Sequence, residues 1–372
     1  MEIRIVDTDG AFDGLEGSWN RLSDKAAPNF FSSFDYVRAA WKHFRSPGDR
    51  LYILVLSEGP SVVGIAPFYI GIERYGRWGV PHRTIRWIAT WGGDRPRLLV
   101  EGNEEMFWKE ILCFLERDRH SCEVIDLVEQ PVDGPEGRGW SFLAQSGWYW
   151  EREPDAIDYY ISLEGSWEDY LKGRSSNTRR GWDRRKRRLS SNPGGHEIER
   201  ISDPEEMREA LSRFVDIERE SWKAKARIGV GKNERSFLFY EDLLVRAAGK
   251  GRAFIYFLKS SGKIIAGEVC FIQQDVVYSL LTTYLPSYAA YSPGILILAD
   301  LTQHLFGGPY RELDLLGMRD DGTQPGHKAW WATGKRETVH LTGYRVYSRL
   351  LPLVVGKRLK RILMRKREGK LD

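Results

Sequence analysis

The stretch that decides the fold is Gly251–Leu316, which opens with GRAFIYFLKSSGKIIAGEVCFIQQDVVYSLLTTY over residues 251–284. Arg252–Lys259 and Lys263–Ile272 are runs of apolar, β-branched and aromatic residues on either side of a Ser-Ser-Gly turn. This pattern is typical of a β-hairpin. A third run of the same kind, Val276–Tyr284, predicts another antiparallel strand.

The second part of this stretch predicts a helix followed by a strand. Ser292, Pro293 and Gly294 form a turn, and apolar residues at helical spacing follow over Ile295–Phe306. Glu312–Leu316 (ELDLL) then predicts a short buried strand. Three antiparallel strands that lead into a helix and a neighbouring strand are suited to holding a phosphate-bearing cofactor.

The composition indicates two globular domains. A chain of 372 residues exceeds the usual size of one hydrophobic core, and 42% of its residues are hydrophobic. The formal net charge is only +4, so clusters of charge say more than the total. Three cysteines without CxxC spacing argue against a disulfide framework, and seven histidines without HxxxH spacing predict no metal site.

The N-terminal sequence MEIRIVDTDG lacks the pattern of a signal peptide, and no apolar run approaches the roughly 20 residues that span a bilayer. We therefore expect a cytoplasmic protein.

Two hairpins of similar sequence suggest a duplicated fold. LYILVLSEGPSVVGIAPFYI over residues 51–70 aligns by eye with AFIYFLKSSGKIIAGEVCFI over residues 253–272, and helices precede both. Strands mixed with helices in each half predict an α/β class, more exactly an α+β arrangement around a mixed sheet. We expect the junction between the copies at Glu164–Arg174.

Elsewhere the pattern predicts two separate strands, Trp148–Glu153 and Tyr159–Leu163, at the end of the first half. A short helix over Trp167–Lys172 follows them.

Two further helices have recognisable start signals. A long helix over Pro204–Trp222 is expected to have Asp203 as its N-cap, and a helix over Phe34–Phe44 is opened by Ser32 and Ser33.

Five sequence blocks carry a resemblance to a known family. They are FSSFDYVRAAWKHF (31–44), YLKGRSSNTRRGWDRRKRRL (170–189), IIAGEVCF (264–271), YSPGILILADL (291–301) and GHKAWWA (326–332). In this order and spacing, over about residues 30–345, the chain resembles the CelD/BcsL-like acetyltransferases of the GNAT (acyl-CoA N-acyltransferase) superfamily. These are bacterial relatives of the transferases that build peptidoglycan interpeptide bridges.

The resemblance implies tandem GNAT-like acyl-CoA N-acyltransferase domains. The expected boundaries are 1–163 for a degenerate N-terminal domain, 164–345 for the domain that binds the acyl donor, and 346–372 for a basic C-terminal helix. The implied co-substrate is acetyl-CoA or another acyl-CoA. Its pantetheine would pair with the edge of the strand 276–284 and its pyrophosphate would sit at the start of the next helix.

The residues implied in cofactor binding are Leu281, Thr282, Thr283, Ser292, Pro293 and Gly294. A helix N-terminus offers unpaired N–H groups and partial positive charge to an anion. The chain departs from the family here, because SYAAYSPG replaces the usual Q/R-x-x-G-x-G/A phosphate loop. The alternative is that Ser-Pro-Gly is a plain helix start with Pro near the first position.

Acyl transfer to an amine needs a base, an oxyanion stabiliser and an acid for the leaving thiol. Glu268 lies in the middle of a strand, where an unpaired carboxylate is unfavourable, so it is either a site residue or an ion-pair partner. Asp314, at the end of its strand, is likewise either a site residue or an ion-pair partner. Tyr284 could donate a proton to the leaving group or simply pack.

Two further residues are candidates for substrate binding. The family resemblance favours Lys328 in PGHKAWW, although an exposed loop lysine is the alternative. Trp222 could cover an acceptor pocket, although an aromatic residue at a helix end more often packs.

The segment 172–188 holds nine Lys or Arg residues against one Asp. It could be a solvated helix face, it could bind the 3′-phosphate of CoA or an anionic acceptor, or it could bind tRNA. The related bridge-building transferases use aminoacyl-tRNA, but the long helical arm associated with tRNA binding has no counterpart here.

The tail 344–370 alternates apolar and basic residues. We expect its apolar side to pack on the domain, and peripheral association with an anionic membrane surface is the alternative.

Three functions follow from these observations. The first is an acyl-CoA-dependent N-acyltransferase, expected to acetylate an amino group of a small-molecule or glycan-precursor acceptor in cell-envelope or polysaccharide biosynthesis. The second is a catalytically silent GNAT-like binding protein in exopolysaccharide assembly, suggested by the missing phosphate-loop glycines. The third is an aminoacyl-tRNA-dependent transferase.

Overall fold

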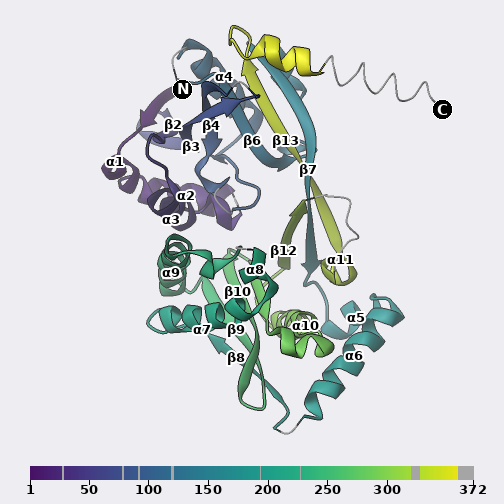
Figure 1. Ribbon diagram of the computed structural model, residues 1–372. Helices are drawn as coiled ribbons and strands as arrows, with labels where there is room; N and C mark the ends of the chain where they lie inside the picture. Colours follow the sequence, from purple (N-terminus) through teal and green to yellow (C-terminus); the bar gives the residue numbers. More distant parts are fainter. Residues whose placement is uncertain are drawn as a thin grey trace, which may run out of the picture. The chain divides into compact units, whose positions relative to one another are not determined.

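The chain forms two compact structural units in a computed structural model, and each unit is built from separate segments of sequence (Figure 1). Unit 1 comprises residues 1–26, 46–155 and 338–372, and unit 2 comprises residues 27–45 and 156–337. The structure describes residues 1–26, 29–77, 79–90, 93–118, 121–192, 194–226, 228–319 and 327–358.

The strands of unit 1 follow the order β1-β2-β3-β4-β6-β13. Every neighbouring pair is antiparallel except β4 and β6, which are parallel. The strands are β1 (Glu2–Val6), β2 (Arg50–Glu58), β3 (Ser61–Tyr75), β4 (Val80–Trp87), β6 (Val124–Pro131) and β13 (Gly334–Arg345), and β5 (Leu99–Val100) pairs with β3.

The helices of unit 1 cover its sheet with large aromatic side chains. Helix α4 (Glu104–Arg117) begins after Asn103, whose side chain accepts a hydrogen bond from the Met106 N–H. Its buried residues include Trp108, which packs nearly at right angles to Trp87 of β4. The other elements of this unit are α1 (Asp9–Asp13), α2 (Glu16–Ala26), the short 3-10 turns η2 (Ile88–Thr90), η3 (Pro135–Gly137) and η4 (Ser141–Gln145), and a helical turn over 351–358.

The strands of unit 2 repeat the arrangement of unit 1. Their order is β8-β9-β10-β11-β12-β7, and again the fourth and fifth strands, β11 and β12, form the parallel pair. The predicted hairpin repeat is therefore confirmed, since β2 and β3 occupy the positions of β9 and β10. The strands are β7 (Trp148–Ser162), β8 (His196–Ile201), β9 (Ala253–Ser260), β10 (Lys263–Gln273), β11 (Val276–Tyr284) and β12 (Glu312–Arg319).

Helices cover both faces of the sheet in unit 2. One face packs on α10 (Pro293–Leu305), and the other packs on α7 (Met207–Glu220), whose Phe214 ring lies against Gly267 of β10. Phe30, from the segment 27–45, stacks on Phe271 with ring centroids 4.3 Å apart. The remaining helical elements are α3 (Phe34–Phe44), α5 (Trp167–Lys172), α6 (Ser176–Ser190), α8 (Trp222–Ala226), α9 (Glu234–Gly249) and α11 (His327–Trp331), with η1 (Phe30–Ser32), η5 (Val230–Lys232) and η6 (Pro286–Tyr291).

The mixed α/β class with a mixed sheet is confirmed, and three local predictions can be compared with the structure. The prediction of two strands at 148–153 and 159–163 was wrong, because β7 continues through the exposed Pro154. Asp203 is not the cap of α7, since its Oδ1 accepts from the Glu205 N–H and the helix begins only at Met207. Ser33 is the cap of α3 and accepts from the Tyr36 N–H.

The exchange of segments between the units differs from the simple division expected from the sequence. Residues 148–155 of β7 belong to unit 1 and residues 156–162 to unit 2, while β13 is divided in the opposite sense. Each sheet is therefore completed by a strand from the other half of the sequence.

Candidate functional site

The parallel strands β11 and β12 separate after a short stretch of pairing. Only Val276–Tyr278 of β11 pairs with Glu312–Asp314 of β12. Beyond that point β11 continues to Tyr284 without a strand beside it on this side in the described structure, while β12 goes on to pair with β7. The two strands therefore enclose a V-shaped opening whose edges carry backbone hydrogen-bonding groups, which an extended ligand can pair with.

A β-bulge in β11 adjoins this opening. Val269 pairs with Leu281 and Cys270 pairs with Ser279, so Leu280 is the extra residue. A bulge bends its strand and redirects neighbouring side chains. Here it brings the Ser279 hydroxyl to Glu268, to which it donates a hydrogen bond.

Glu268 is a buried carboxyl group beside the opening. It is 1% exposed, lies opposite Thr282 in the register, and its Oε2 has no hydrogen-bond partner within the described structure. Burial raises the pKa of Glu268 to about 7, although the Ser279 hydrogen bond and the nearby charges of Lys328 and Lys223 act in the opposite direction. The group can therefore gain or lose a proton near neutral pH.

Lys223 and Glu218 form an ionic pair that we did not predict from the sequence. Lys223 Nζ donates to the Thr282 carbonyl oxygen at 2.8 Å and lies 3.7 Å from Glu218 Oε1. Glu218 is 1% exposed and its Oε2 accepts from the Gly231 N–H. Burial lowers the pKa of Lys223. The only sequence signal was an acidic residue five positions before a lysine near a helix end, which is too common to identify a site.

Asp314 lies at the point where β12 leaves β11, but its carboxylate is held by its own strand. Oδ1 accepts from the Leu316 N–H at 2.8 Å, and Oδ2 lies 3.6 Å from Arg336 Nη1. The register of β12 with β7 shifts between Asp314 and Gly317, and Leu316 has a φ of +63°. Asp314 therefore anchors a strained bend that directs β12 away from β11.

Lys328 projects from α11 toward the same bend. Its Nζ donates to the Leu315 carbonyl oxygen, and its charge acts on Glu268. The structure thus brings Lys328 of α11 close to the bend of β12 and within electrostatic reach of Glu268 of β10, whereas the Asp314 carboxylate is directed to the Leu316 N–H and Arg336.

The start of α10 lies over the end of β11. A Cβ on Gly294 would meet Tyr284 Cδ1 at 3.7 Å and Thr282 Cγ2 at 4.0 Å, so the helix N-terminus and these residues are neighbours. Ser292 adopts a left-handed conformation with a φ of +51° and does not cap the helix. Its hydroxyl instead accepts from Arg185 Nε of α6 at 3.0 Å. An arginine thus stands beside the N-terminus of α10, where positive charge favours an anion.

The remaining predicted residues surround this arrangement. Leu281 is half-buried on the bulged part of β11, and Thr283 is buried with its hydroxyl lacking a partner among the described residues. Pro293 is the first residue of α10 and is buried. Trp222 begins α8, but its side chain lies outside the described part of the structure.

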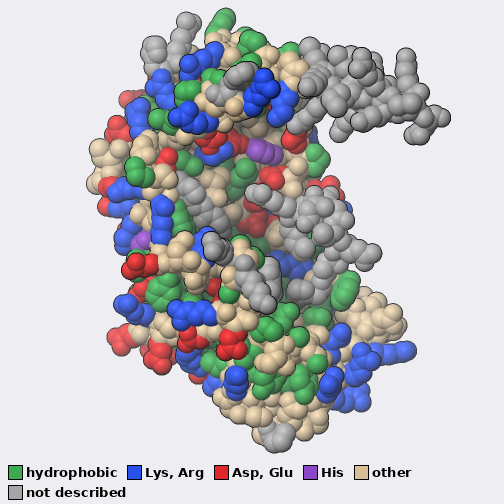
Figure 2. Space-filling model, viewed as in Figure 1, with side chains coloured by type: hydrophobic (Ala, Val, Ile, Leu, Met, Phe, Trp, Pro, Cys, Tyr) green, Lys and Arg blue, Asp and Glu red, His purple; other side chains and the backbone are tan. Residues whose placement is uncertain are grey.

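A cavity of about 400 Å³ opens between α6 and the start of α10. Arg184 and Arg185 line it together with the exposed Trp330 and the buried Trp331. Basic side chains gather over this part of unit 2 at the lower right of Figure 2. An aromatic surface beside two guanidinium groups suits a flat ring attached to an anionic group.

Within the described residues, no cluster of three or more His, Cys, Asp or Glu side chains is arranged to hold a metal ion. Nor does any described helix combine the length and apolar character needed to cross a bilayer. Of the basic tail, only the part up to residue 358 is described, and there Leu350 and Val354 pack against Val124 and Tyr344. Residues 359–372 lie outside the described residues.

A known protein family matches the part of the chain that builds the opening. Residues 176–329 match the family described as acetyltransferase (GNAT) domain. No curated protein matches the sequence significantly.

Solved structures resemble the chain along nearly its full length. The crystal structure of FemX has a TM-score of 0.65 and 11% identity, and the match covers 95% of this chain and 100% of that one. L-PGS from Bacillus licheniformis has a TM-score of 0.55 and 13% identity, over 92% and 96% of the two chains. A conserved protein of unknown function from Bacteroides thetaiotaomicron has a TM-score of 0.54 and 12% identity, over 92% and 100%.

At these identities the solved structures establish the fold alone. The family match covers the strands and helices that build the site, from α6 to α11. Residues 176–329 thus match the acetyltransferase (GNAT) domain family, which supports a transferase, and they lie within a duplicated α/β fold.

Proposed function

We propose that the protein is an acyl-CoA-dependent N-acyltransferase whose site is the opening between β11 and β12. The observation that carries this proposal is the buried Glu268 beside a strand edge left open where β11 and β12 part. A thioester donor paired along β11 would place its carbonyl carbon near Glu268, whose pKa is close to 7.

In this proposal Glu268 is the general base. The acceptor nitrogen attacks the thioester carbonyl carbon, and its proton passes to Glu268 directly or through one water. The C–S bond then breaks, and Tyr284 supplies a proton to the leaving thiolate. Asp314 acts as a positioning residue, since it holds the bend that keeps β12 away from β11.

The donor is held along β11 and at the start of α10. Leu281, Thr282 and Thr283 present the strand edge, and the turn Ser292–Gly294 receives the pyrophosphate. Gly294 supplies the backbone N–H there, because Pro293 has none and the Ser292 N–H donates to the Ala289 carbonyl oxygen. Arg185 adds a positive charge to that helix N-terminus. This replaces in part the phosphate loop that the sequence lacks.

The acceptor is an amine of a small molecule or glycan precursor of the cell envelope, with Trp222 and Lys328 on its side of the site. The role in polysaccharide biosynthesis is supported only by the resemblance to the CelD/BcsL-like proteins. The residues of the opening support an amine as the acceptor group and do not specify the molecule that carries it. We further propose the limits 1–163, 164–345 and 346–372 for the two copies of the duplicated sequence and the basic tail. The proposed location is cytoplasmic, and peripheral to the membrane if the basic tail contacts it.

Calorimetric titration of the full chain tests the proposal. We expect acetyl-CoA to bind with micromolar affinity and desulfo-CoA, which lacks the CoA sulfur and therefore the acyl group, to bind more weakly. The absence of acetyl-CoA binding at millimolar concentration would contradict the proposal and would favour a catalytically silent binding protein.

An aminoacyl-tRNA-dependent transferase is the second candidate, because α6 presents a dense row of basic residues. Arg188 lies over the Tyr291 ring and Lys186 pairs with Asp300, so part of this charge is used within the domain. Binding of bulk tRNA that weakens steeply with salt, without binding of acetyl-CoA, would favour this candidate over the first.

A further inference from the structure

Lys223 of α8 lies beside β11, where the acyl donor is expected to pair, and the proposed mechanism does not use it. Its Nζ donates a hydrogen bond to the Thr282 carbonyl oxygen at 2.8 Å. The Lys223 side chain is only 16% exposed, whereas lysine side chains are mostly exposed in proteins. A lysine buried at this strand is therefore a candidate for a role in the acyl transfer.

The pairing of β10 with β11 shows that the Thr282 carbonyl group points away from β10. The Leu285 N–H donates to the Ile265 carbonyl oxygen. The adjacent pairs run without a register shift to Glu268 and Thr282. Hydrogen-bonded and non-hydrogen-bonded pairs alternate in an antiparallel ladder, so Glu268 and Thr282 form a non-hydrogen-bonded pair. The N–H and C=O groups of Thr282 are therefore directed to the open edge of β11, and Lys223 Nζ lies at that edge.

Glu268 and Lys223 reach this edge from opposite faces of the sheet. Successive side chains of a strand point to opposite faces. Gly267 faces the Phe214 ring of α7, so the next residue, Glu268, points to the face that α10 covers. Lys223 comes from the α7 side, where it lies beside Glu218 of that helix. A ligand at the edge of β11 can therefore meet both side chains without their competing for one position.

The ammonium group is held in place and keeps one donor for a ligand. Glu218 Oε1 lies 3.7 Å from Lys223 Nζ, and Glu218 Oε2 accepts from the Gly231 N–H at 2.8 Å. An ammonium group has three N–H donors. Within the described structure one of them donates to Thr282 and another faces Glu218. The third is left for an oxygen atom at the same edge.

The surroundings of Lys223 strengthen its effect on a negative charge. Burial lowers the pKa of Lys223, and the charges of Glu218 and Glu268 act in the opposite direction. Glu218 is itself 1% exposed, so the ion pair lies largely out of water. A buried ammonium group stabilises a developing negative charge more strongly than an exposed one does.

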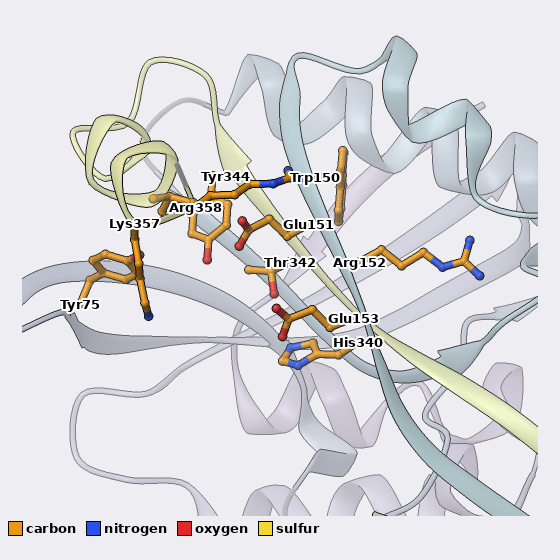
Figure 3. Close-up of a pocket in the computed structure, with 11 residues that line it drawn as sticks. Tyr75, Trp150, Glu151, Arg152, Glu153, His340, Thr342, Tyr344, Lys357 and Arg358 are labelled. Atoms are coloured by element: carbon orange, nitrogen blue, oxygen red, sulfur yellow. The ribbon is translucent and has the colours of Figure 1, made fainter. Parts of the chain in front are cut away.

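Unit 1 does not repeat this arrangement in its described residues. Its strand β4 takes the position of β11, but β4 ends at Trp87, one residue after its last pair with β6 at Arg86 and Asp126. The cavity of about 480 Å³ in unit 1 lies instead beside β7 and β13 (Figure 3). Of its basic lining residues, Arg358 already donates to the Tyr149 hydroxyl. The buried lysine at an open strand edge is therefore a feature of unit 2.

We propose that Lys223 is a further catalytic residue, whose ammonium group donates a hydrogen bond to the thioester carbonyl oxygen of the acyl donor. This inference rests on the proposed acyl transfer at the same opening. When the acceptor nitrogen attacks the carbonyl carbon, the C=O double bond becomes a single bond and the oxygen takes the negative charge. Lys223 keeps its proton and stabilises this oxyanion together with the Thr282 N–H. When the C–S bond breaks, the C=O double bond forms again and the sulfur leaves with the electron pair.

Calorimetry with two probes on the full chain tests this role. Acetyl-CoA carries the carbonyl oxygen, and S-ethyl-CoA has a methylene group in place of the carbonyl group. We expect the wild type to bind acetyl-CoA about tenfold more tightly than S-ethyl-CoA, and Lys223→Met to bind the two equally. No preference in the wild type, or a preference that persists in Lys223→Met, would overturn the role of Lys223 while leaving the acyl-CoA site in place. If the wild type bound neither probe at millimolar concentration, the proposed function would fail, and the role of Lys223 with it.

Infrared spectroscopy reports on the carbonyl group itself. Acetyl-CoA with an isotopic label at the carbonyl carbon gives a stretching band that can be followed in the complex. The hydrogen bond from Lys223 should lower this frequency relative to free acetyl-CoA, and Lys223→Met should remove most of the shift. The same shift in the wild type and in Lys223→Met would overturn the proposal.

Two further variants separate this role from a structural one. Lys223→Met leaves Glu218 buried without its partner, so the double variant Glu218→Gln/Lys223→Met, in which neither side chain is charged, is measured beside it. The double variant should also lose the preference for acetyl-CoA, and retention of the preference in a folded double variant would overturn the proposal. Lys263→Met, at an exposed position at the start of β10, is the matched control and should keep the preference. Its loss in this control would likewise contradict a specific role for Lys223.

Discussion

Replacing Glu268 with glutamine should stabilise the protein at alkaline pH while slowing its chemistry. Burial raises the pKa of Glu268 from 4.5 to about 7, and each step of one in pKa corresponds to about 1.36 kcal/mol. Because the folded pKa is raised, this contribution to the stability of the wild type is fully present below about pH 4.5, and about 3 kcal/mol is lost as pH rises from there to about 7. A glutamine side chain cannot ionise, so the Glu268→Gln variant should escape this loss.

Between about pH 5 and pH 8 the stability of Glu268→Gln relative to the wild type should therefore increase by about 2 to 3 kcal/mol. The two units need not unfold in one step, so hydrogen exchange of peptides from β10 and β11 in urea is the appropriate measurement. Glu209→Gln, an exposed position on α7, is the matched control and should show no pH-dependent difference.

The same variant should transfer acyl groups about 10²- to 10⁴-fold more slowly, and wild-type kcat/KM should rise with pH through about 7. If the difference in stability between Glu268→Gln and the wild type did not change with pH, the raised pKa of Glu268 would be refuted. Full turnover in Glu268→Gln would refute its role as the base.

Three further changes test other parts of the structure. Lys223→Met removes the partner of the buried Glu218 and should lower the free energy of unfolding of unit 2 by about 3 kcal/mol, measured by urea unfolding. An unchanged urea midpoint would show that this ion pair does not stabilise unit 2. Arg185→Gln should weaken acetyl-CoA binding about tenfold in calorimetry, whereas Arg187→Gln, at an exposed position on the same helix, should leave it unchanged. Equal effects of the two substitutions would show that Arg185 does not contribute to donor binding. Gly267→Ala would place a Cβ 2.7 Å from Phe214 Cδ2 and should therefore destabilise unit 2 by about 1–3 kcal/mol in thermal unfolding. An unchanged melting temperature would contradict this prediction and would show that the Phe214 ring moves aside at no cost.

The local elements of the fold were largely predictable because they depend on short patterns. The strand over Val276–Tyr284 and the helix over Trp167–Lys172 have the predicted bounds, since each is a clean apolar or amphipathic run between polar turns. The duplicated hairpin was predictable for the same reason. The strand β7 was predicted as two pieces, whereas the structure continues it through Pro154, which lies at an exposed position.

The exchange of β7 and β13 between the units could not be predicted, because strand pairing over such a separation depends on the whole fold rather than on local pattern. The contacts at the candidate site could be predicted only in part. Glu268 was conspicuous as a charge inside an apolar strand, but the bulge that brings Ser279 to it depends on the register of β10 and β11. Lys223 and Arg185 were hidden among many similar residues, and only the folded chain shows which of them reach the opening.

Hydrogen exchange with and without acetyl-CoA tests the central claim most directly, because the claim concerns one strand edge. Saturating acetyl-CoA should slow exchange in peptides that contain residues 279–284 of β11 and 292–296 at the start of α10, and should leave β2 and β3 of unit 1 unchanged. Slowed exchange confined to unit 1, or no change in β11 under conditions where acetyl-CoA is bound, would contradict the placement of the acyl donor between β11 and β12.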